Sequence, residues 1–267
     1  MNRLVAEFSK AATSRRKLLI PFITAGDPKP DFTVPMMHAM VTAGADIIEL
    51  GVPFSDPMAD GPVIQRASER ALEQGMSLRK VLKLVSEFRE QDQNTPVVLM
   101  GYLNPVEAMG YEDFAEAAKS AGVDGVLTVD IPPEEAEEYV ALLKAREIDP
   151  IFLLAPNSSD ERIKKMDAVG SGYLYYVSLK GVTGAGHLDL TDVDKKIQQI
   201  KKHTKLPIGV GFGVKDAQTA KSIAQIADAV VVGSALISKI ESNPDNLVKA
   251  KQEIVDLLNS MRYAMDS

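Results

Sequence analysis

The sequence predicts an α/β protein, a single (β/α)8 barrel, and three observations support that fold class. About eight short apolar segments alternate with amphipathic ones, at the rhythm typical of parallel barrels. The length of 267 residues suits one such barrel, and no linker or shift in composition divides residues 1–267, so one domain is expected. An open doubly wound sheet is the alternative, but the G-x-G-x-x-G motif usual in its first strand–helix turn is missing there.

The expected strands are short runs of β-branched and aliphatic residues bounded by glycine, proline or aspartate. They cover residues 18–24, 46–50, 96–100, 125–129, 150–154, 172–178, 207–210 and 229–232. Continuous apolar character, rather than strict alternation, is typical of parallel strands that are buried on both faces.

The expected helices have apolar residues at three- and four-residue spacing. They cover residues 1–13, 31–44, 62–74, 77–88, 111–121, 194–203, a segment after 216 and a last segment around 247–261. This pattern gives an extra helix before the first strand and extra helices after the second and eighth strands.

Several polar residues are expected to begin these helices. Asp31, Ser77 and Asp216 are placed as N-caps. Asp130 is expected to cap a helix that starts with two prolines at 132–133. The segment 158–161 reads as a capping box, with glutamate three residues after serine.

Composition argues against several classes of function. The formal net charge is −7 without a strongly basic patch, so nucleic-acid binding is not expected. With no cysteine and three distant histidines, neither a thiol nucleophile nor a metal site is expected. No segment approaches the roughly 18 apolar residues of a membrane span. The segment 14–17 resembles a twin-arginine signal, but Pro21 interrupts the apolar run after it, so a cytoplasmic protein is expected.

Two carboxylates stand in the unusual stretch 46–62, DIIELGVPFSDPMADGP. Glu49 ends a buried strand, where desolvation should raise its pKa and suit proton donation near neutral pH. Asp60 follows on a polar loop and is expected to stay ionised and to face a developing cation. The structural alternatives are a glutamate bound by backbone groups and a helix N-cap, respectively. Asp27 and Asp56 are expected to be turn and cap residues.

Glycine-rich segments follow the last three expected strands. Backbone N–H groups there can approach an anion closely, and the loops after strands seven and eight are the usual phosphate site of such barrels. The residues of the expected phosphate cradle are Gly184, Phe212, Gly213, Gly233 and Ser234. The alternative is that these glycines only shape turns.

An apolar slot of aromatic width is expected beside Glu49, because the strand ends there carry large apolar side chains. Its residues are Phe22, Met100, Leu127, Tyr175 and Phe212.

The chain resembles the tryptophan synthase alpha subunit family over nearly its full length. The matching strings are PFITAGDP, ELGVPFSDPMADGP, GYLNP, DIPPEE, APNSS, SLKGVTGA, GFGV and VVGSALI. The resemblance implies a lyase of tryptophan biosynthesis that cleaves indole-3-glycerol phosphate into indole and D-glyceraldehyde 3-phosphate. It also implies that the chain has no cofactor of its own, since pyridoxal phosphate is expected only in the beta partner.

The resemblance also implies roles for single residues. Glu49 corresponds to the acid/base and Asp60 to the carboxylate that stabilises the indole N–H. Thr183 falls in the loop after strand six, which in the family closes the site. Phe22, Leu127 and Tyr175 correspond to the indole pocket, and the five cradle residues to the phosphate site.

A beta subunit is the implied partner, in an alpha2beta2 complex that passes indole between its subunits. The surfaces expected to contact it are the loop from Pro53 to Pro57 and the turns Asn104-Pro105 and Ile131-Pro132. Two alternatives stay open: a sibling phosphate-binding barrel, such as an isomerase or synthase of the same pathway, and a catalytically silent barrel that only regulates the beta subunit.

Overall fold

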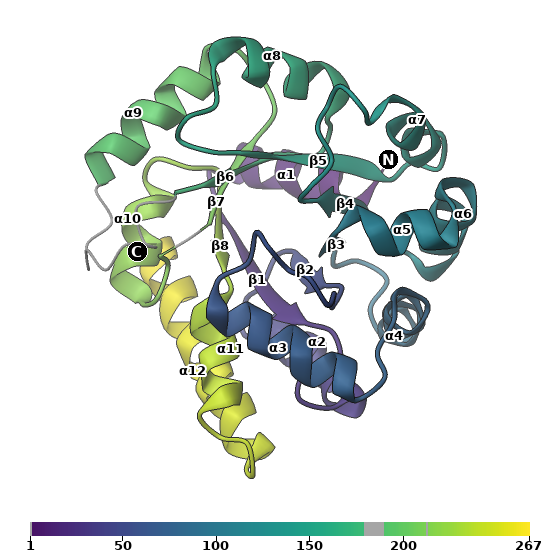
Figure 1. Cartoon of the computed structure of the whole chain (residues 1–267). Coiled ribbons are helices and arrows are strands. Elements are labelled where there is room, and N and C mark those ends of the chain that lie inside the picture. Colours follow the sequence, from purple (N-terminus) through teal and green to yellow (C-terminus); the bar gives the residue numbers. More distant parts are fainter. Residues whose placement is uncertain (1, 179–189, 212) are drawn as a thin grey trace.

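The computed structural model describes residues 2–178, 190–211 and 213–267, and shows a closed barrel of parallel strands surrounded by helices (Figure 1). The strands follow one another around the barrel in sequence order. They are β1 (Leu18–Thr24), β2 (Ile48–Gly51), β3 (Val97–Gly101), β4 (Gly125–Thr128), β5 (Asp149–Leu154), β6 (Leu174–Val177), β7 (Ile208–Gly211) and β8 (Ala229–Val232).

Pairing of β1 with β8 closes the barrel, with Leu18 opposite Ala229 and Pro21 opposite Val232. The predicted (β/α)8 barrel is therefore confirmed, and the open doubly wound sheet is excluded. Strand boundaries agree with the sequence prediction to within about two residues, because continuous apolar runs mark strands that are buried on both faces.

The helices surround the barrel wall, except for α1, which lies across one end of the barrel (Figure 1). Within the described residues they are α1 (Arg3–Ser14), α2 (Pro30–Thr42), α3 (Pro62–Glu73), α4 (Leu78–Arg89), α5 (Leu103–Met109), α6 (Tyr111–Ala121), α7 (Glu137–Ala145), α8 (Asp160–Val169), α9 (Leu190–Lys201), α10 (Ala217–Ala224), α11 (Ser234–Glu241) and α12 (Leu247–Asp266). The extra helices before β1, after β2 and after β8 are as predicted.

Helix α1 closes the N-terminal end of the barrel, which we call the barrel floor. Its inner face joins the inward-facing strand residues in one apolar cluster, and the ring of Phe8 lies 5.5 Å from that of Tyr173. The Asn2 amide donates to the carbonyl of Asp124 (2.7 Å) and to the carboxylate of Asp149 (2.9 Å), both at strand N-terminal ends. The opposite end, where the strands finish, we call the barrel mouth.

The β2 strand shows how the two sides of the barrel wall alternate. Ile48 and Leu50 belong to the apolar layer that joins the wall to the surrounding helices, whereas Ile47 belongs to the interior cluster. Because neighbouring side chains of a strand point to opposite faces, Glu49 points into the barrel near its mouth.

Two elements differ from the prediction, and the Asp130 carboxylate connects them. Asn104-Pro105 lies inside helix α5 rather than in a turn, and α7 begins at Glu137, so residues 130–135 do not start a helix. The Asp130 carboxylate accepts the N–H of Leu103 (2.8 Å), the first residue of α5. Asp130 therefore caps a helix that precedes it in the chain by 27 residues.

Only some of the predicted helix N-caps are present. Asp216 accepts the N–H of Thr219 as expected, and Ser77 is an N-cap position without a side-chain bond. Asp31 lies inside α2, whose N-cap is Lys29. The cap of α8 is Ser159 rather than the serine before it.

Candidate active site

Glu49 is fully buried at the barrel mouth, opposite Phe22 of β1 and Val98 of β3 in the strand register. The Tyr173 hydroxyl donates to its Oε1 (3.1 Å), while Oε2 has no hydrogen-bond partner in the described part of the chain. Burial raises the pKa of Glu49 to about 8, and the Tyr173 hydrogen bond opposes that rise. Burial therefore favours the protonated form of Glu49 near neutral pH, and no described residue bonds to its second oxygen.

The structural alternative for Glu49 was a carboxylate bound by backbone groups. Its hydrogen-bond partner among the described residues is instead a tyrosine hydroxyl, and burial disfavours the charged form. Such an arrangement makes a carboxyl group a proton donor and acceptor near neutral pH rather than a structural anchor.

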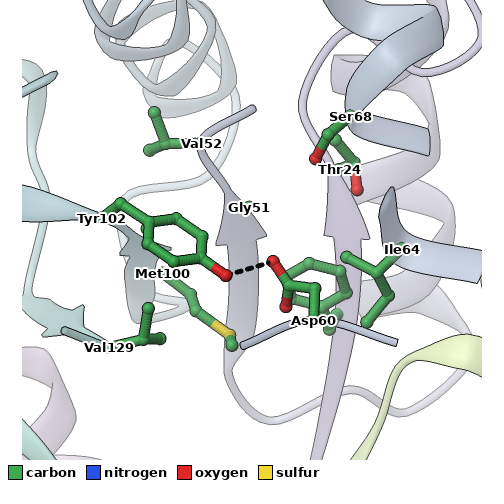
Figure 2. A pocket seen from close by; sticks show the side chains of 11 residues that line it. Thr24, Gly51, Val52, Asp60, Ile64, Ser68, Met100, Tyr102 and Val129 are labelled. Atoms are coloured by element: carbon green, nitrogen blue, oxygen red, sulfur yellow. Dashed lines mark hydrogen bonds between the residues drawn. The ribbon is translucent and has the colours of Figure 1, made fainter. Parts of the chain in front are cut away.

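Asp60 lies on the loop between β2 and α3, and one tyrosine holds it in place. The Tyr102 hydroxyl donates to Asp60 Oδ2 (3.0 Å) and accepts the N–H of Ala59 (3.0 Å), as Figure 2 shows for the first bond. The Phe54 ring packs on the same tyrosine at 5.2 Å. One side chain at the end of β3 therefore fixes three neighbouring parts of the loop.

The environment of Asp60 differs from the expected solvated loop. The side chain is half-buried, and burial raises its pKa while Tyr102 lowers it. The N-cap alternative is wrong, because α3 has Gly61 as its N-cap and no side-chain cap bond. The carboxylate is thus available to a ligand.

The expected apolar slot is assembled in part. Phe22 and Met100 line the same pocket as Asp60 at the barrel mouth. Figure 2 shows Met100 and Asp60 there. Leu127 is buried in the interior cluster against which Met100 packs. These side chains come from β1, β3 and β4, so the barrel brings together residues that are distant in sequence.

Tyr175 lies close enough to feel both carboxylates. Its pKa is raised well above the ordinary value, first by burial and then by the charges of Glu49 and Asp60. A Cβ added at Gly211 would lie 2.0 Å from the Tyr175 hydroxyl, so only glycine on the adjoining strand leaves room for this ring.

The expected phosphate cradle is described only in part. Gly233 is the N-cap of α11 without a side-chain cap bond, and Ser234 is the exposed first residue of that helix. Gly213 follows β7 with a φ of +77°, which favours glycine. Free N–H groups of the first helical turn point out of a helix N-terminus. Thr183, Gly184 and Phe212 lie outside the described residues.

Two tyrosines of this site were not recognised in the sequence. Tyr173 contacts Glu49, and Tyr102 contacts Asp60. The strand period would have placed Tyr173 on the inward face together with Tyr175. Tyr102 directly follows a strand end, the position where function gathers in barrels.

Two further findings concern the part of the chain that the structure describes. It contains no group of three or more histidine, cysteine, aspartate or glutamate side chains that could hold a metal ion. None of its helices is long and apolar enough to cross a membrane.

Comparisons with known proteins agree with one another. The sequence model of the tryptophan synthase alpha chain family matches residues 8–266. A tryptophan synthase alpha chain of Methylococcus capsulatus is 66% identical over the full length of both chains. The crystal structure of the alpha subunit from Legionella pneumophila str. Paris superposes with a TM-score of 0.94 at 46% identity, covering 100% of this chain and 99% of that one. A chain from the Pyrococcus furiosus tryptophan synthase a2b2 complex matches with a TM-score of 0.85 at 38% identity, covering 92% of this chain and 98% of its own.

Proposed function

This chain belongs to the tryptophan synthase alpha chain family, and on that premise we propose how its residues carry out the reaction. It is a lyase of tryptophan biosynthesis that cleaves indole-3-glycerol phosphate into indole and glyceraldehyde 3-phosphate. The alpha chain needs no cofactor, since pyridoxal phosphate belongs to the beta subunit, with which it forms an alpha2beta2 complex. A sibling isomerase or synthase is therefore set aside.

We propose Glu49 as the acid and base. Its protonated carboxyl group, favoured by burial, donates a proton to the indole ring carbon that carries the glycerol phosphate chain. The ring nitrogen then becomes cationic. The resulting carboxylate removes the proton of the neighbouring side-chain hydroxyl, the carbon–carbon bond breaks, and its electron pair returns to the ring as indole leaves. The fully buried position and the free Oε2 support this role.

We propose that Asp60 stabilises that cation. An ionised carboxylate held at the ring nitrogen acts only once positive charge develops, which is the condition for lowering the barrier rather than tightening substrate binding. The two hydrogen bonds of the Tyr102 hydroxyl keep the loop in one position and support this assignment. Phe22, Met100, Leu127 and Tyr175 are proposed to enclose the indole ring.

The phosphate group is proposed to bind at the N-terminus of α11, through backbone N–H groups near Gly233 and Ser234, together with Gly213 after β7. Partial positive charge at a helix N-terminus favours an anion there. Phe22 links the two halves of the site, because a Cβ at Gly233 would lie 3.3 Å from its ring. Gly184, Phe212 and Thr183 are proposed as further contacts by the family resemblance.

Three further proposals concern the domain organisation, the surface for the beta subunit and the localisation of the protein. Residues 1–267 are proposed to form one domain, supported by the pairing of β1 with β8. The beta subunit is proposed to contact the loop from Pro53 to Pro57, where Met58 next to it is 81% exposed, and the segments Asn104-Pro105 and Ile131-Pro132. The protein is proposed to be cytoplasmic.

The observation that carries the mechanism is the buried Glu49 with one oxygen free, and substitution of this residue tests it. Glu49→Gln should lower kcat for indole release by at least about 10³-fold while substrate binding is largely retained, because an amide cannot transfer the proton. Glu73→Gln, an exposed change of the same kind on α3, is the control and should behave as wild type. Both variants are assayed with and without a beta subunit. Unchanged turnover in Glu49→Gln would refute the assignment.

A further inference from the structure

Helix α3 begins two residues after Asp60 and is tied directly to its loop. The Gln65 side-chain amide donates to the carbonyl of Asp60 (2.9 Å), and the N–H groups of Ile64 and Gln65 both donate to the carbonyl of Gly61 (3.0 Å each). Any shift of the first turns of α3 therefore moves the Asp60 backbone. The position of α3 on the barrel is thus a determinant of where the Asp60 carboxylate lies.

The inner face of α3 meets the active site itself. Ile64 and Ser68 line the same pocket as Asp60 (Figure 2). Arg66 and Arg70 are spaced four residues apart on another face of the same helix, so one helix carries pocket residues and two cations.

Arg70 fastens this helix to the end of β1. Its Nε and Nη2 lie 2.7 Å and 2.9 Å from the two carboxylate oxygens of Asp27, a bidentate pair. The Asp27 side chain is fully buried, and the backbone N–H of Asp27 donates to the carbonyl of Thr24 (3.2 Å), the last residue of β1. The turn expected at Asp27 is present, but its carboxylate pairs with a distant arginine instead of capping a helix.

Arg70 also reaches the helix of the proposed phosphate site. Its Nη1 lies 3.4 Å from the carboxylate of Glu241, the last residue of α11. Arg66 pairs with the same carboxylate, but its side chain is 48% exposed, against 28% for Arg70. The planar guanidinium of Arg70 contacts the carboxylates of both Asp27 and Glu241. It therefore fixes the orientation of α3 as well as its distance from β1 and α11.

We propose that Arg70 is a positioning residue for the reaction: through Asp27 and Glu241 it fixes α3, and with it Asp60, relative to β1 and α11. This inference rests on the proposed role of Asp60. It assigns to Arg70 no contact with the substrate.

The kinetic signature follows from the role of Asp60. A carboxylate that acts only on the cation formed during the reaction affects kcat much more than KM. A displacement of the order of 1 Å at such a group can cost as much as about 10²-fold in rate. A purely structural ion pair would instead lower the thermal stability of the folded enzyme and leave its kcat unchanged.

Arg70→Gln tests the proposal, with Arg66→Gln as the matched control on the same helix. The unfolding temperature is measured for both purified proteins, and indole release is then measured well below it. We expect Arg70→Gln to lower kcat by about tenfold or more with KM changed by less than about threefold. Arg66→Gln should change each constant by less than about twofold, because its pair with Glu241 is about half-exposed on the arginine side and involves no fully buried carboxylate.

A second variant covers the case in which Arg70→Gln does not fold. Asp27→Asn/Arg70→Gln leaves no unpaired buried carboxylate, yet an amide pair does not reproduce the two parallel charge-assisted bonds, so the same loss of kcat is expected. Wild-type kcat in whichever variant folds, an effect on KM alone, or an equal loss in Arg66→Gln would overturn the proposal. Asp60→Asn separates the two hypotheses. Full activity in that variant would refute the proposed role of Asp60 and with it the premise of the Arg70 proposal, whereas a severe loss there together with wild-type kcat in Arg70→Gln would refute the Arg70 proposal alone.

Discussion

The floor and the mouth of the barrel both contain buried carboxylates, but they treat them differently. On the floor, Asp124 accepts hydrogen bonds from Arg89 (2.8 Å), from Arg3 (2.9 Å) and from the N–H of Val97 (2.9 Å). At the mouth, Glu49 accepts a hydrogen bond from the Tyr173 hydroxyl and pairs with no cation in the described part of the chain. The same chemical group thus pairs with two arginines at one end and is shifted toward its neutral form by burial at the other.

The unpartnered polar atoms of the described residues follow the same division. Thr24 Oγ1 and Glu49 Oε2 are buried without a partner, and both lie at the mouth. The third such atom, His38 Nε2, belongs to α2, where its ring packs on Phe88. Satisfied polar groups stabilise a fold, whereas unsatisfied ones in a pocket are available to a ligand. Stability and chemistry are therefore placed at opposite ends of one barrel.

The largest expected effect separates these two ends by activity. Asp60→Asn should lower kcat by about 10³-fold, or about 4 kcal/mol, because an amide cannot balance a cation on the ring nitrogen. The unfolding temperature should change little, since burial already disfavours the charge of Asp60 in the folded protein. Indole release and thermal unfolding measured on the same sample test both parts. A variant that loses both stability and activity would contradict the division between floor and mouth.

The opposite substitution on the floor should cost stability instead. Asp124→Asn leaves Arg89, which is 6% exposed, without its carboxylate, and burial already lowers the pKa of that arginine. Loss of one partner of a buried pair costs about 3 kcal/mol or more of unfolding free energy. Urea denaturation measures this loss, and kcat of the folded variant should stay within about twofold of wild type.

Glu147→Gln provides the control for the floor, because its pair with Lys119 (3.2 Å) is exposed. Such surface pairs contribute about 0.5 kcal/mol or less. Equal losses in Glu147→Gln and Asp124→Asn would show that burial is not what makes the Asp124 cluster important.

The sequence predicts some residues of the mouth better than others. The separation in sequence between contacting residues explains the difference. Glu49 could be placed because its strand is a local apolar pattern and barrel chemistry gathers at strand ends. Tyr102 and Arg70 could not, because their partners Asp60 and Asp27 lie 42 and 43 residues away in the chain. The prediction that Asp130 caps the helix after it is wrong for the same reason, because Asp130 caps α5, a helix that the local pattern did not show.

A dependence of stability on pH tests the mouth directly, through the proton of Glu49 rather than through activity. The pKa of Glu49 rises from 4.5 to about 8 on folding, so between these pH values the folded protein holds a proton that the unfolded chain releases. The stabilisation is complete below the unfolded pKa and is lost as pH rises through the folded one, by up to about 1.4 kcal/mol per pH unit. Glu49→Gln has no such proton. Its unfolding free energy relative to wild type should therefore increase from pH 5 to pH 8 and then level off, as urea denaturation at several pH values would measure. Glu73→Gln, an exposed change of the same kind on α3, is measured alongside as the control for the substitution itself. A constant difference for Glu49→Gln as well would mean that burial does not shift this carboxyl group, and the contrast between floor and mouth would then rest on geometry alone.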